Sequence, residues 1–318
     1  MLDLKLIEVR DETERVRVIR FSSASGDTLP GYSAGAHLEF DLGSPGKRAY
    51  SLIDWPCQSL AEGARENYTV AVQREDDGQG GSSAMHQLDV GQVIQASEPV
   101  NDFALSKSSA PVVLLAGGIG VTPMISMATE LHAQARPFVF HYTARSQSVM
   151  SFHHELDSAF SKDMRFHFDD ESPLDLAALM GSLDASTELY LCGPRGMIDA
   201  ARSAAQTAGL SNDNIHVELF STTDTAGEDM PFEVEIKETG EVFVIPAGKT
   251  IIEVLEDAGK DLMYDCQRGD CGICQTDVIS GEPDHRDVVL SEAERASGEV
   301  MQICVSRAKS SRLVLDIL

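Results

Sequence analysis

The stretch DCQRGDCGICQTD, residues 265–277, places three cysteines within nine residues and has a glycine in each gap between them. The spacing C-x4-C-x2-C is the plant-type spacing of a [2Fe–2S] cluster, for which a fourth thiolate comes from a distant part of the chain. Gly269 and Gly272 allow the loop to curl so that its backbone N–H groups point inward, toward a group that carries negative charge. The sequence therefore predicts an iron–sulfur cluster bound by Cys266, Cys271, Cys274 and Cys304.

Two other interpretations of the cysteine loop stay open at this point. Structural zinc usually takes its ligands as two close pairs, whereas Cys304 has no close Cys or His partner in the sequence. A redox-active CxxC dithiol would account for Cys271 and Cys274 only. The N-terminal residues 1–16 show no export signal. We therefore expect a cytoplasmic protein. In a reducing cytosol, clustered cysteines serve metal or redox chemistry.

Length and charge limit the classes of function. The 318 residues are enough for two or three domains. A formal net charge of −26 argues against a nucleic-acid partner, because phosphate binding needs a basic face, and it suits a protein partner with a basic patch. The longest apolar stretch, residues 112–127, is interrupted by three glycines, a Thr-Pro pair and a serine, so we expect no membrane span.

The N-terminal segment, residues 1–106, consists of short β-like runs separated by Gly, Pro, Asp and Ser. This spacing predicts an antiparallel barrel or sandwich. The runs are residues 4–12, 15–23, 37–42, 48–53, 67–75 and 92–97.

The middle segment, residues 107–224, alternates strands and helices, which predicts a parallel sheet with helices on both faces. The expected strands are 111–116, 137–145, 164–170, 188–194 and 215–220, and the expected helices are 123–135, 153–160, 173–180 and 195–209.

The C-terminal segment, residues 225–318, follows a polar stretch, STTDTAGEDM (221–230), that we expect to be an interdomain linker. A hairpin around Thr239 and Gly240 and a helix over residues 250–259 are expected ahead of the cysteine loop.

Two glycine-containing turns in the middle segment are candidates for binding a dinucleotide. In LLAGGIGVTPM (114–124) a strand enters a glycine turn, and Pro123 fits the first position of a helix with Thr122 as its N-cap. The helix N-terminus would face a pyrophosphate, although the GxGxxG fingerprint is absent. The second turn is LCGPRGM (191–197), in which Cys192 is expected to be a small residue near the ligand. The strand–turn–helix context and the presence of a second turn favour a nucleotide, and the alternative explanation of both turns is tight packing of strands on helices.

Two further motifs lie in the N-terminal segment. KRAYSL (47–52) places Arg48 and Tyr50 on one face of a strand, where an arginine suits a phosphate and a tyrosine ring suits a flat heterocycle. DGQGGSSAMHQL (77–88) is a Gly/Ser loop that enters a helix, which is a second possible anion site. Each motif alone also fits an ordinary barrel edge or turn.

The order of these motifs is more specific than any one of them. RxYS, GGSS, GGIGVTPM, CGP and C-x4-C-x2-C…C follow one another along one chain. In this combination the sequence closely resembles the phthalate dioxygenase reductase family, over nearly its whole length, including EPDHRD (282–287) and CVSRAKS (304–310). The resemblance implies a flavin-binding β-barrel at 1–106, an NAD-binding α/β domain at 107–224 and a plant-type ferredoxin domain of β-grasp fold at 225–318.

The resemblance also implies roles for individual residues. Those expected to line the flavin, with Ser51 near its N5 atom, are Arg48, Ala49, Tyr50, Ser51, Val72 and Arg74. Those expected to hold the flavin phosphate are Gly80, Gly81, Ser82 and Ser83. Those expected to bind NADH are Gly117, Gly118, Ile119, Gly120, Thr122, Cys192, Gly193 and Pro194. Glu218 and Phe220 match a Glu-x-Phe ending whose aromatic ring covers the flavin. No catalytic acid or base is expected.

The implied function is electron transfer from NADH through a flavin and the cluster to a Rieske-type oxygenase. FMN is favoured over FAD because the region 57–67 offers no platform for an adenine. NADH is favoured over NADPH because the acidic FDDES (168–172) would repel the 2′-phosphate that Arg145 could otherwise meet. The alternatives are a stand-alone NADH:acceptor reductase, acting on a quinone or a ferredoxin, and a redox-inactive zinc-binding module.

Overall fold

The computed structural model describes residues 1–56, 63–76, 78, 80–220 and 229–317. The chain forms two compact units, Met1–Glu218 and Leu219–Leu318, and each is described by itself. Within the described ranges no helix is both long and apolar enough to cross a membrane.

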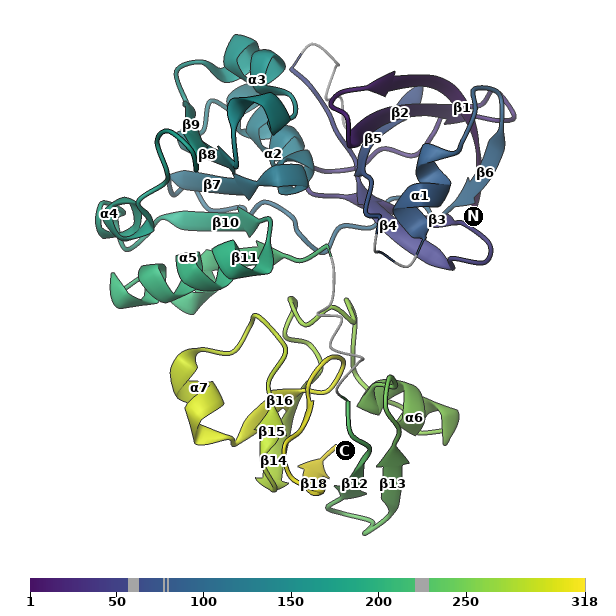
Figure 1. The fold of residues 1–318 in the computed structure, drawn as a ribbon, viewed down its shortest axis with the longest axis vertical. Helices are drawn as coiled ribbons and strands as arrows, with labels where there is room; N and C mark the ends of the chain where they lie inside the picture. Colours follow the sequence, from purple (N-terminus) through teal and green to yellow (C-terminus); the bar gives the residue numbers. More distant parts are fainter. Residues whose placement is uncertain (57–62, 77, 79, 221–228, 318) are drawn as a thin grey trace. The chain divides into compact units, whose positions relative to one another are not determined.

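The first part of the first unit is a six-stranded antiparallel sheet that curls as an open barrel (Figure 1). The strand order is β4-β3-β6-β1-β2-β5. Alternate residues point inward, so that Leu4 and Leu6 on β1 and Leu38 and Phe40 on β3 are buried in one core. The elements are β1 (Leu2–Asp11), β2 (Val16–Ser23), β3 (His37–Asp41), β4 (Lys47–Ser51), β5 (Asn67–Gln73), α1 (Gly81–His86) and β6 (Val93–Ala96).

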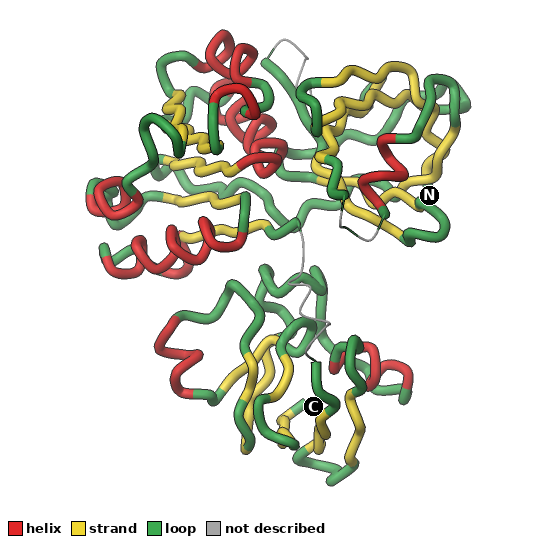
Figure 2. The backbone as a smooth tube through the Cα atoms, viewed as in Figure 1, coloured by secondary structure: helices red, strands yellow, loops and turns green. Residues whose placement is uncertain are grey.

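The second part of this unit is a parallel sheet of order β11-β10-β7-β8-β9. Every residue of the central strand β7 is buried, as expected for a strand covered on both faces. Figure 2 shows that most helices of the unit belong to this part, whereas the barrel part consists mainly of strands. The elements are β7 (Val112–Gly117), η1 (Gly118–Gly120), α2 (Val121–Ala133), β8 (Phe138–Ala144), η2 (Gln147–Val149), α3 (His153–Phe160), β9 (Met164–Phe168), α4 (Leu176–Gly181), β10 (Glu188–Cys192), α5 (Arg195–Thr207), η3 (Asn212–Asn214) and β11 (Ile215–Glu218).

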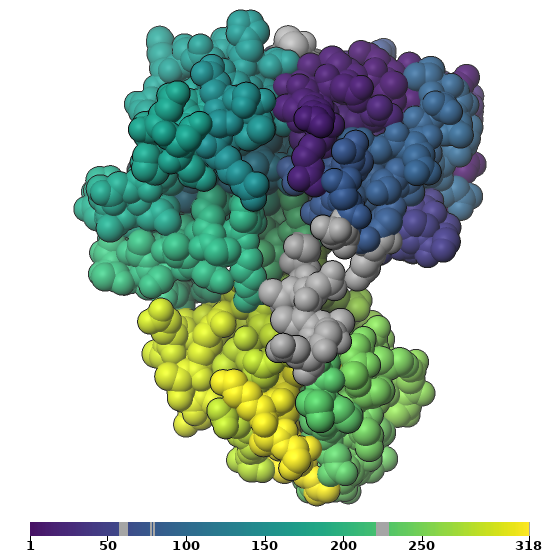
Figure 3. All heavy atoms as spheres, viewed as in Figure 1, coloured from purple at the N-terminus to yellow at the C-terminus, as the bar shows by residue number. Residues whose placement is uncertain are grey.

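The two parts of the first unit share a core. Ile53 and Ala71 of the barrel part pack in one cluster with Val121, Met124 and Ile125 of α2. In the space-filling view the purple and blue atoms of the barrel part abut the teal atoms of the parallel-sheet part (Figure 3). The two parts can therefore share a binding site.

The second unit is a mixed five-stranded sheet of order β13-β12-β18-β14-β16, in which only the β12–β18 pair is parallel among the described strands. Thr250 and Glu253 form a reciprocal capping box at the start of α6, which fixes where this helix begins. The elements are β12 (Phe232–Ile236), β13 (Val242–Ile245), α6 (Ile251–Asp257), β14 (Gln275–Ser280), β15 (Pro283–Asp284), α7 (Glu292–Ser297), β16 (Val300–Gln302), β17 (Arg307–Ala308) and β18 (Arg312–Asp316).

The predicted fold class is confirmed: an antiparallel barrel, an α/β part with a parallel sheet, and a β-grasp unit at the C-terminus. The turn at Gly240, with φ of +69°, closes the predicted β12–β13 hairpin. Residues 221–228 of the predicted linker and residues 57–62 lie outside the described residues.

One local prediction is wrong. The helix after the glycine turn begins at Val121 with Gly120 as its N-cap, so Thr122 is already helical and its hydroxyl donates to the carbonyl of Ile119 at 3.0 Å. The 3-10 turn η1 adds helical residues ahead of the expected start. Pro123 is tolerated within the first turn because the first N–H groups of a helix have no intrahelical partner.

Candidate functional site

The four cysteines of the second unit come together. Interactions between thiols link Cys271 to Cys266, Cys266 to Cys304, and Cys304 to Cys274. Cys274 and Cys304 are buried, and Cys266 and Cys271 are partly buried. Hydrogen bonds among the thiols shift their pKa values in opposite directions. The contact with Cys271 lowers the pKa of Cys266, and the contact with Cys266 raises the pKa of Cys304. The loop and the turn that follows β16 thus deliver four sulfurs to one place.

The backbone of the loop is shaped around these sulfurs. Gly269 and Gly272 both have φ near +80°, a conformation that side chains disfavour. A Cβ atom at Gly269 would lie 2.6 Å from Cγ2 of Val305, so the position also has no room for one. The N–H of Arg268 donates to Sγ of Cys266 at 3.3 Å. This is the inward-pointing amide that a thiolate ligand of a negatively charged cluster needs.

Four converging thiols are the donor set of a [2Fe–2S] cluster. Among the described residues, no group of three or more His, Cys, Asp or Glu side chains could hold one metal ion. A [2Fe–2S] cluster instead takes two thiolates on each of two irons. The thiols form one continuous chain of contacts, Cys271–Cys266–Cys304–Cys274, so all four lie together.

Two polar residues beside the cysteines were not predicted from the sequence. The carboxylate of Asp270 accepts from the N–H of Leu219 at 2.9 Å and pairs with Arg268 at 3.2 Å, and burial raises the pKa of Asp270 to about 7. The side chain of Gln302 is fully buried, and its Oε1 lies 3.4 Å from Sγ of Cys274. The one sequence feature that could have drawn attention to Gln302 is that it lies two residues before the fourth cysteine, Cys304.

The two glycine turns of the first unit adjoin each other. A Cβ atom at Gly120 would clash with the backbone of Cys192, and one at Gly117 would lie 2.7 Å from Cδ of Pro194. The hydroxyl of Tyr142, a fully buried residue on β8, donates to the carbonyl of Gly118 at 3.1 Å. The close approach explains why glycine occupies positions 117 and 120. It also brings the backbones of the two turns together.

The RAYS strand and the Gly/Ser loop also adjoin each other. A Cβ atom at Gly81 would lie 2.7 Å from Cγ of Arg48, so β4 and the start of α1 lie side by side (Figure 1). The hydroxyl of Ser51 is buried and makes no hydrogen bond to any described residue, as expected for a group that serves a ligand. Burial raises the pKa of Tyr50 to about 12, which keeps its hydroxyl neutral. These features fit a flavin held between β4 and α1.

The other predicted residues are placed as follows. The hydroxyl of Ser82 accepts from the N–H of Glu75 at 3.0 Å, and the carbonyl of Val72 contacts the ring of His86 at 2.8 Å. Arg74 pairs with an exposed aspartate, Asp76, at 2.9 Å. Gly80 has φ of +87° and its carbonyl accepts from the N–H of Ala84 at 2.9 Å, Glu218 is buried, and Phe220 is 45% exposed.

Comparison with known proteins gives the same arrangement. The family model described as the 2Fe-2S iron-sulfur cluster binding domain matches residues 234–309. Vanillate O-demethylase oxidoreductase of Pseudomonas sp. (strain HR199 / DSM 7063) is 38% identical, with 100% of both chains covered. A solved structure titled as phthalate dioxygenase reductase, a modular structure for electron transfer from pyridine nucleotides to [2Fe–2S], is 35% identical, covers 99% of this chain and 97% of that chain, and has a TM-score of 0.70.

The chain belongs to the phthalate dioxygenase reductase family. It is an oxidoreductase that serves as an electron-transfer component, with a [2Fe–2S] domain at its C-terminus. Similar proteins differ in the activity for which they are named: tetrachlorobenzoquinone reductase of Sphingobium chlorophenolicum is 35% identical, with 99% of this chain and 98% of that protein covered.

Proposed function

We propose that this chain is the NADH-dependent reductase component of a two-component Rieske-type oxygenase or demethylase. Electrons would pass from NADH to a flavin, from the flavin to the [2Fe–2S] cluster, and from the cluster to the oxygenase. The observation that carries the proposal is the presence, in one chain, of two adjoining glycine turns, a strand β4 that lies against the start of α1 and carries an unbonded buried hydroxyl, and four converging thiols. The solved relative, described as a modular structure for electron transfer from pyridine nucleotides to [2Fe–2S], supports the same order.

The proposal assigns each group to a part of the chain. The flavin barrel is residues 1–106, the NAD domain is 107–224 and the ferredoxin domain is 225–318. Flavin-binding residues are Arg48, Ala49, Tyr50, Ser51, Val72, Arg74, Gly80, Gly81, Ser82 and Ser83. Residues that bind NADH or cover the flavin are Gly117, Gly118, Ile119, Gly120, Thr122, Cys192, Gly193, Pro194, Glu218 and Phe220. Cluster ligands are Cys266, Cys271, Cys274 and Cys304.

The side chains divide the work on physical grounds. When bound, a flavin supplies the link between NADH, which gives two electrons as a hydride, and a cluster, which takes one electron at a time. Arg48 would neutralise the flavin phosphate by charge-assisted hydrogen bonds, and the buried hydroxyl of Ser51 would offer a donor near N5. The turn at Gly120 would offer backbone N–H groups to the pyrophosphate of NADH. No side chain has to act as a general acid or base.

The proposal is specific about cofactor and partner. We expect FMN rather than FAD, NADH rather than NADPH, and a cytoplasmic protein, for the reasons given by the sequence. The net charge of −26 would steer the chain toward an oxygenase with a basic docking face.

A second candidate function is a stand-alone NADH:quinone reductase. The 35% identity to tetrachlorobenzoquinone reductase favours it, because that relative matches over nearly the same length. The two functions use the same three sites and differ only in the electron acceptor.

The first test is an anaerobic visible spectrum before and after one equivalent of NADH, with iron counted in the same sample. We expect flavin bands on a broad iron–sulfur absorption, both bleached by NADH, and about two irons per chain. Chromatography of the released flavin decides between FMN and FAD. Flavin without iron, or a colourless zinc protein, would refute the proposal. Faster turnover with a quinone than with any purified Rieske oxygenase would favour the second candidate.

A further inference from the structure

Three polar side chains follow one face of α2, a helix that is otherwise mostly apolar and buried. Ser126, Thr129 and Glu130 are spaced i, i+3 and i+4, so they project from the same side of the helix. Ser126 and Thr129 are each only 1% exposed. We call Ser126, Thr129 and Glu130 the α2 polar row.

The two hydroxyls of the α2 polar row bind the backbone of the barrel part. Oγ of Ser126 donates to the carbonyl of Leu52 at 2.7 Å and accepts from the N–H of Asp54 at 2.9 Å. Oγ1 of Thr129 donates to the carbonyl of Asp54 at 2.8 Å. Three hydrogen bonds therefore hold α2 to one short segment of the barrel part, in surroundings that exclude water and so strengthen them.

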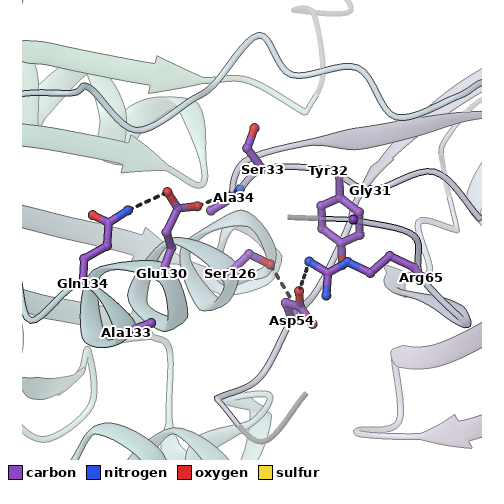
Figure 4. Close-up of a pocket in the computed structure, with 11 residues that line it drawn as sticks. Gly31, Tyr32, Ser33, Ala34, Asp54, Arg65, Ser126, Glu130, Ala133 and Gln134 are labelled. Atoms are coloured by element: carbon purple, nitrogen blue, oxygen red, sulfur yellow. Dashed lines mark hydrogen bonds and ion pairs between the residues drawn. The ribbon is translucent and has the colours of Figure 1, made fainter. Parts of the chain in front are cut away.

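The third member of the row makes a similar contact at a second segment. Oε2 of Glu130 accepts from the N–H of Ala34 at 3.1 Å. Figure 4 shows Glu130 and Ser126 on α2 pointing toward Ala34 and Asp54, across one wall of a cavity of about 580 Å³. Asp54 is held on its other side by Arg65 at 3.0 Å, so the segment that Ser126 contacts is itself fixed.

These contacts lie close in the sequence to both proposed cofactor sites. Leu52 directly follows Ser51, the residue proposed to lie near N5 of the flavin. The helix α2 begins directly after Gly120, in the turn proposed to hold NADH. Ser126 is six residues further on, which at ~1.5 Å per residue is ~9 Å along a rigid helix. One short connection therefore joins the two proposed sites.

We propose that Ser126 and Thr129 are positioning residues for hydride transfer: they fix the nucleotide-binding turn at one distance from the flavin-binding strand. The inference rests on the proposed function. In the step concerned, the C4–H bond of NADH breaks, the hydrogen leaves with both bonding electrons and forms a bond to N5 of the flavin, and NADH is oxidised to NAD+ as the flavin is reduced. Because reacting atoms must approach to ~3–3.5 Å, a displacement of ~1 Å costs ~100-fold in rate.

The test uses the full-length holoprotein and separates position from binding. Stopped-flow bleaching of the flavin is recorded at increasing NADH for the wild type, Ser126→Ala, Thr129→Val, Thr129→Ser and the Ser126→Ala/Thr129→Val double variant. Thr129→Val keeps the shape and removes the hydroxyl, whereas Thr129→Ser keeps the hydroxyl and removes a methyl group. Flavin per chain, the NADH dissociation constant and the emission of Trp55, the single tryptophan, report binding and folding.

We expect a limiting rate of bleaching about tenfold lower in Ser126→Ala and in Thr129→Val, and lower still in the double variant. Flavin content and NADH affinity should stay within twofold of wild type, and Thr129→Ser should bleach at nearly the wild-type rate. The single variants decide the test should the double variant fail to fold.

Two results would overturn the inference. One is a limiting rate within twofold of wild type in all hydroxyl-free variants. The other is a loss of rate matched by an equal loss of flavin or NADH affinity, which would make the row merely structural. Wild-type protein that holds no flavin, or whose flavin NADH does not bleach, would instead refute the proposed function itself.

Discussion

The two units of the molecule distribute the residues of their candidate sites differently along the chain. In Leu219–Leu318, three of the four thiols come from one loop and are identified by spacing alone. In Met1–Glu218, the candidate residues are spread over β4, the start of α1, and the turns that precede α2 and α5. In the proposed function, each would contribute a part of the binding. From this difference we expect that a cluster site loses its cluster when one ligand is removed. A site built from many weak contacts should instead lose affinity gradually as contacts are removed.

The sharpest test of this contrast is Cys271→Ala. A cluster that loses one of four thiolates should not be retained, so iron content should fall below a tenth of wild type and electron delivery to a one-electron protein acceptor should vanish. Reduction of a small two-electron dye by NADH should keep at least half its rate, because the first unit is intact. Iron analysis and the two assays measure this.

Cys192→Ser is the matched control for iron content, because this buried cysteine belongs to the first unit. It should bind iron as wild type does. Loss of dye reduction in a folded Cys271→Ala protein would show that the cluster lies before the dye in the path of electrons, and the proposed order would then be wrong.

The second test adds one methyl group to the nucleotide turn. Gly120→Ala would push a Cβ atom into the backbone of Cys192, which cannot move aside as a flexible side chain could. We expect the KM for NADH to rise at least tenfold. Gly196→Ala is the control, since a Cβ atom at Gly196 meets nothing within 4 Å. Steady-state kinetics with the dye measure the KM for NADH of both variants. Equal KM values in Gly120→Ala and Gly196→Ala would mean that NADH does not bind at this turn.

The fold was predictable from the sequence because each strand and helix repeats one pattern over several residues. On β1 and β3 the alternation of apolar and polar residues matches the burial pattern. The N-cap of α2 was predicted wrongly, because a 3-10 turn at Gly118–Gly120 leaves no mark in hydrophobic periodicity.

The α2 polar row could not have been predicted with its partners. Ser126 and Thr129 bind backbone groups, and every residue type carries a backbone carbonyl and nearly every one an N–H. The sequence therefore shows a polar stripe on an apolar helix but not what it meets. The cysteine spacing differs because the side chains themselves are the ligands.

The third test concerns Arg48, whose side chain lies against Gly81. In the proposed function, Arg48→Ala would remove a charge-assisted contact to the flavin phosphate, which is worth ~1.5–3 kcal/mol, or roughly 10- to 100-fold in affinity. Lys47→Ala is the control, because it removes the same charge from an exposed neighbour. The flavin dissociation constant is measured by equilibrium dialysis. Unchanged flavin binding in Arg48→Ala would place the phosphate elsewhere.

The smallest effect is expected at His141 on β8, which no proposed site uses. Its Nδ1 lies 3.0 Å from Nε2 of His167 on β9. Burial, followed by repulsion from His167 and Arg165, lowers the pKa of His141 to about 4. Between this value and the ~6.5 of an unfolded histidine, the unfolded chain binds a proton that the folded chain does not. The stability of the first unit should therefore be complete above about pH 6.5 and fall as the pH drops through this window.

His141→Gln should reduce the loss of stability per pH unit. The reduction should be smaller than the ~1.4 kcal/mol per pH unit that one proton contributes, because the ring is partly exposed to solvent. Thermal unfolding followed by the emission of Trp55 from pH 5 to pH 7.5 reports the first unit alone, because Trp55 is the single tryptophan. His154→Gln, at an exposed position on α3, should leave the slope unchanged. Equal slopes in the wild type and His141→Gln would mean that His141 keeps its ordinary acidity in the folded chain. The acid sensitivity of the first unit would then have to come from groups other than Asp54, because burial raises the pKa of Asp54 to about 6 and a raised carboxyl pKa favours the folded state as the pH falls.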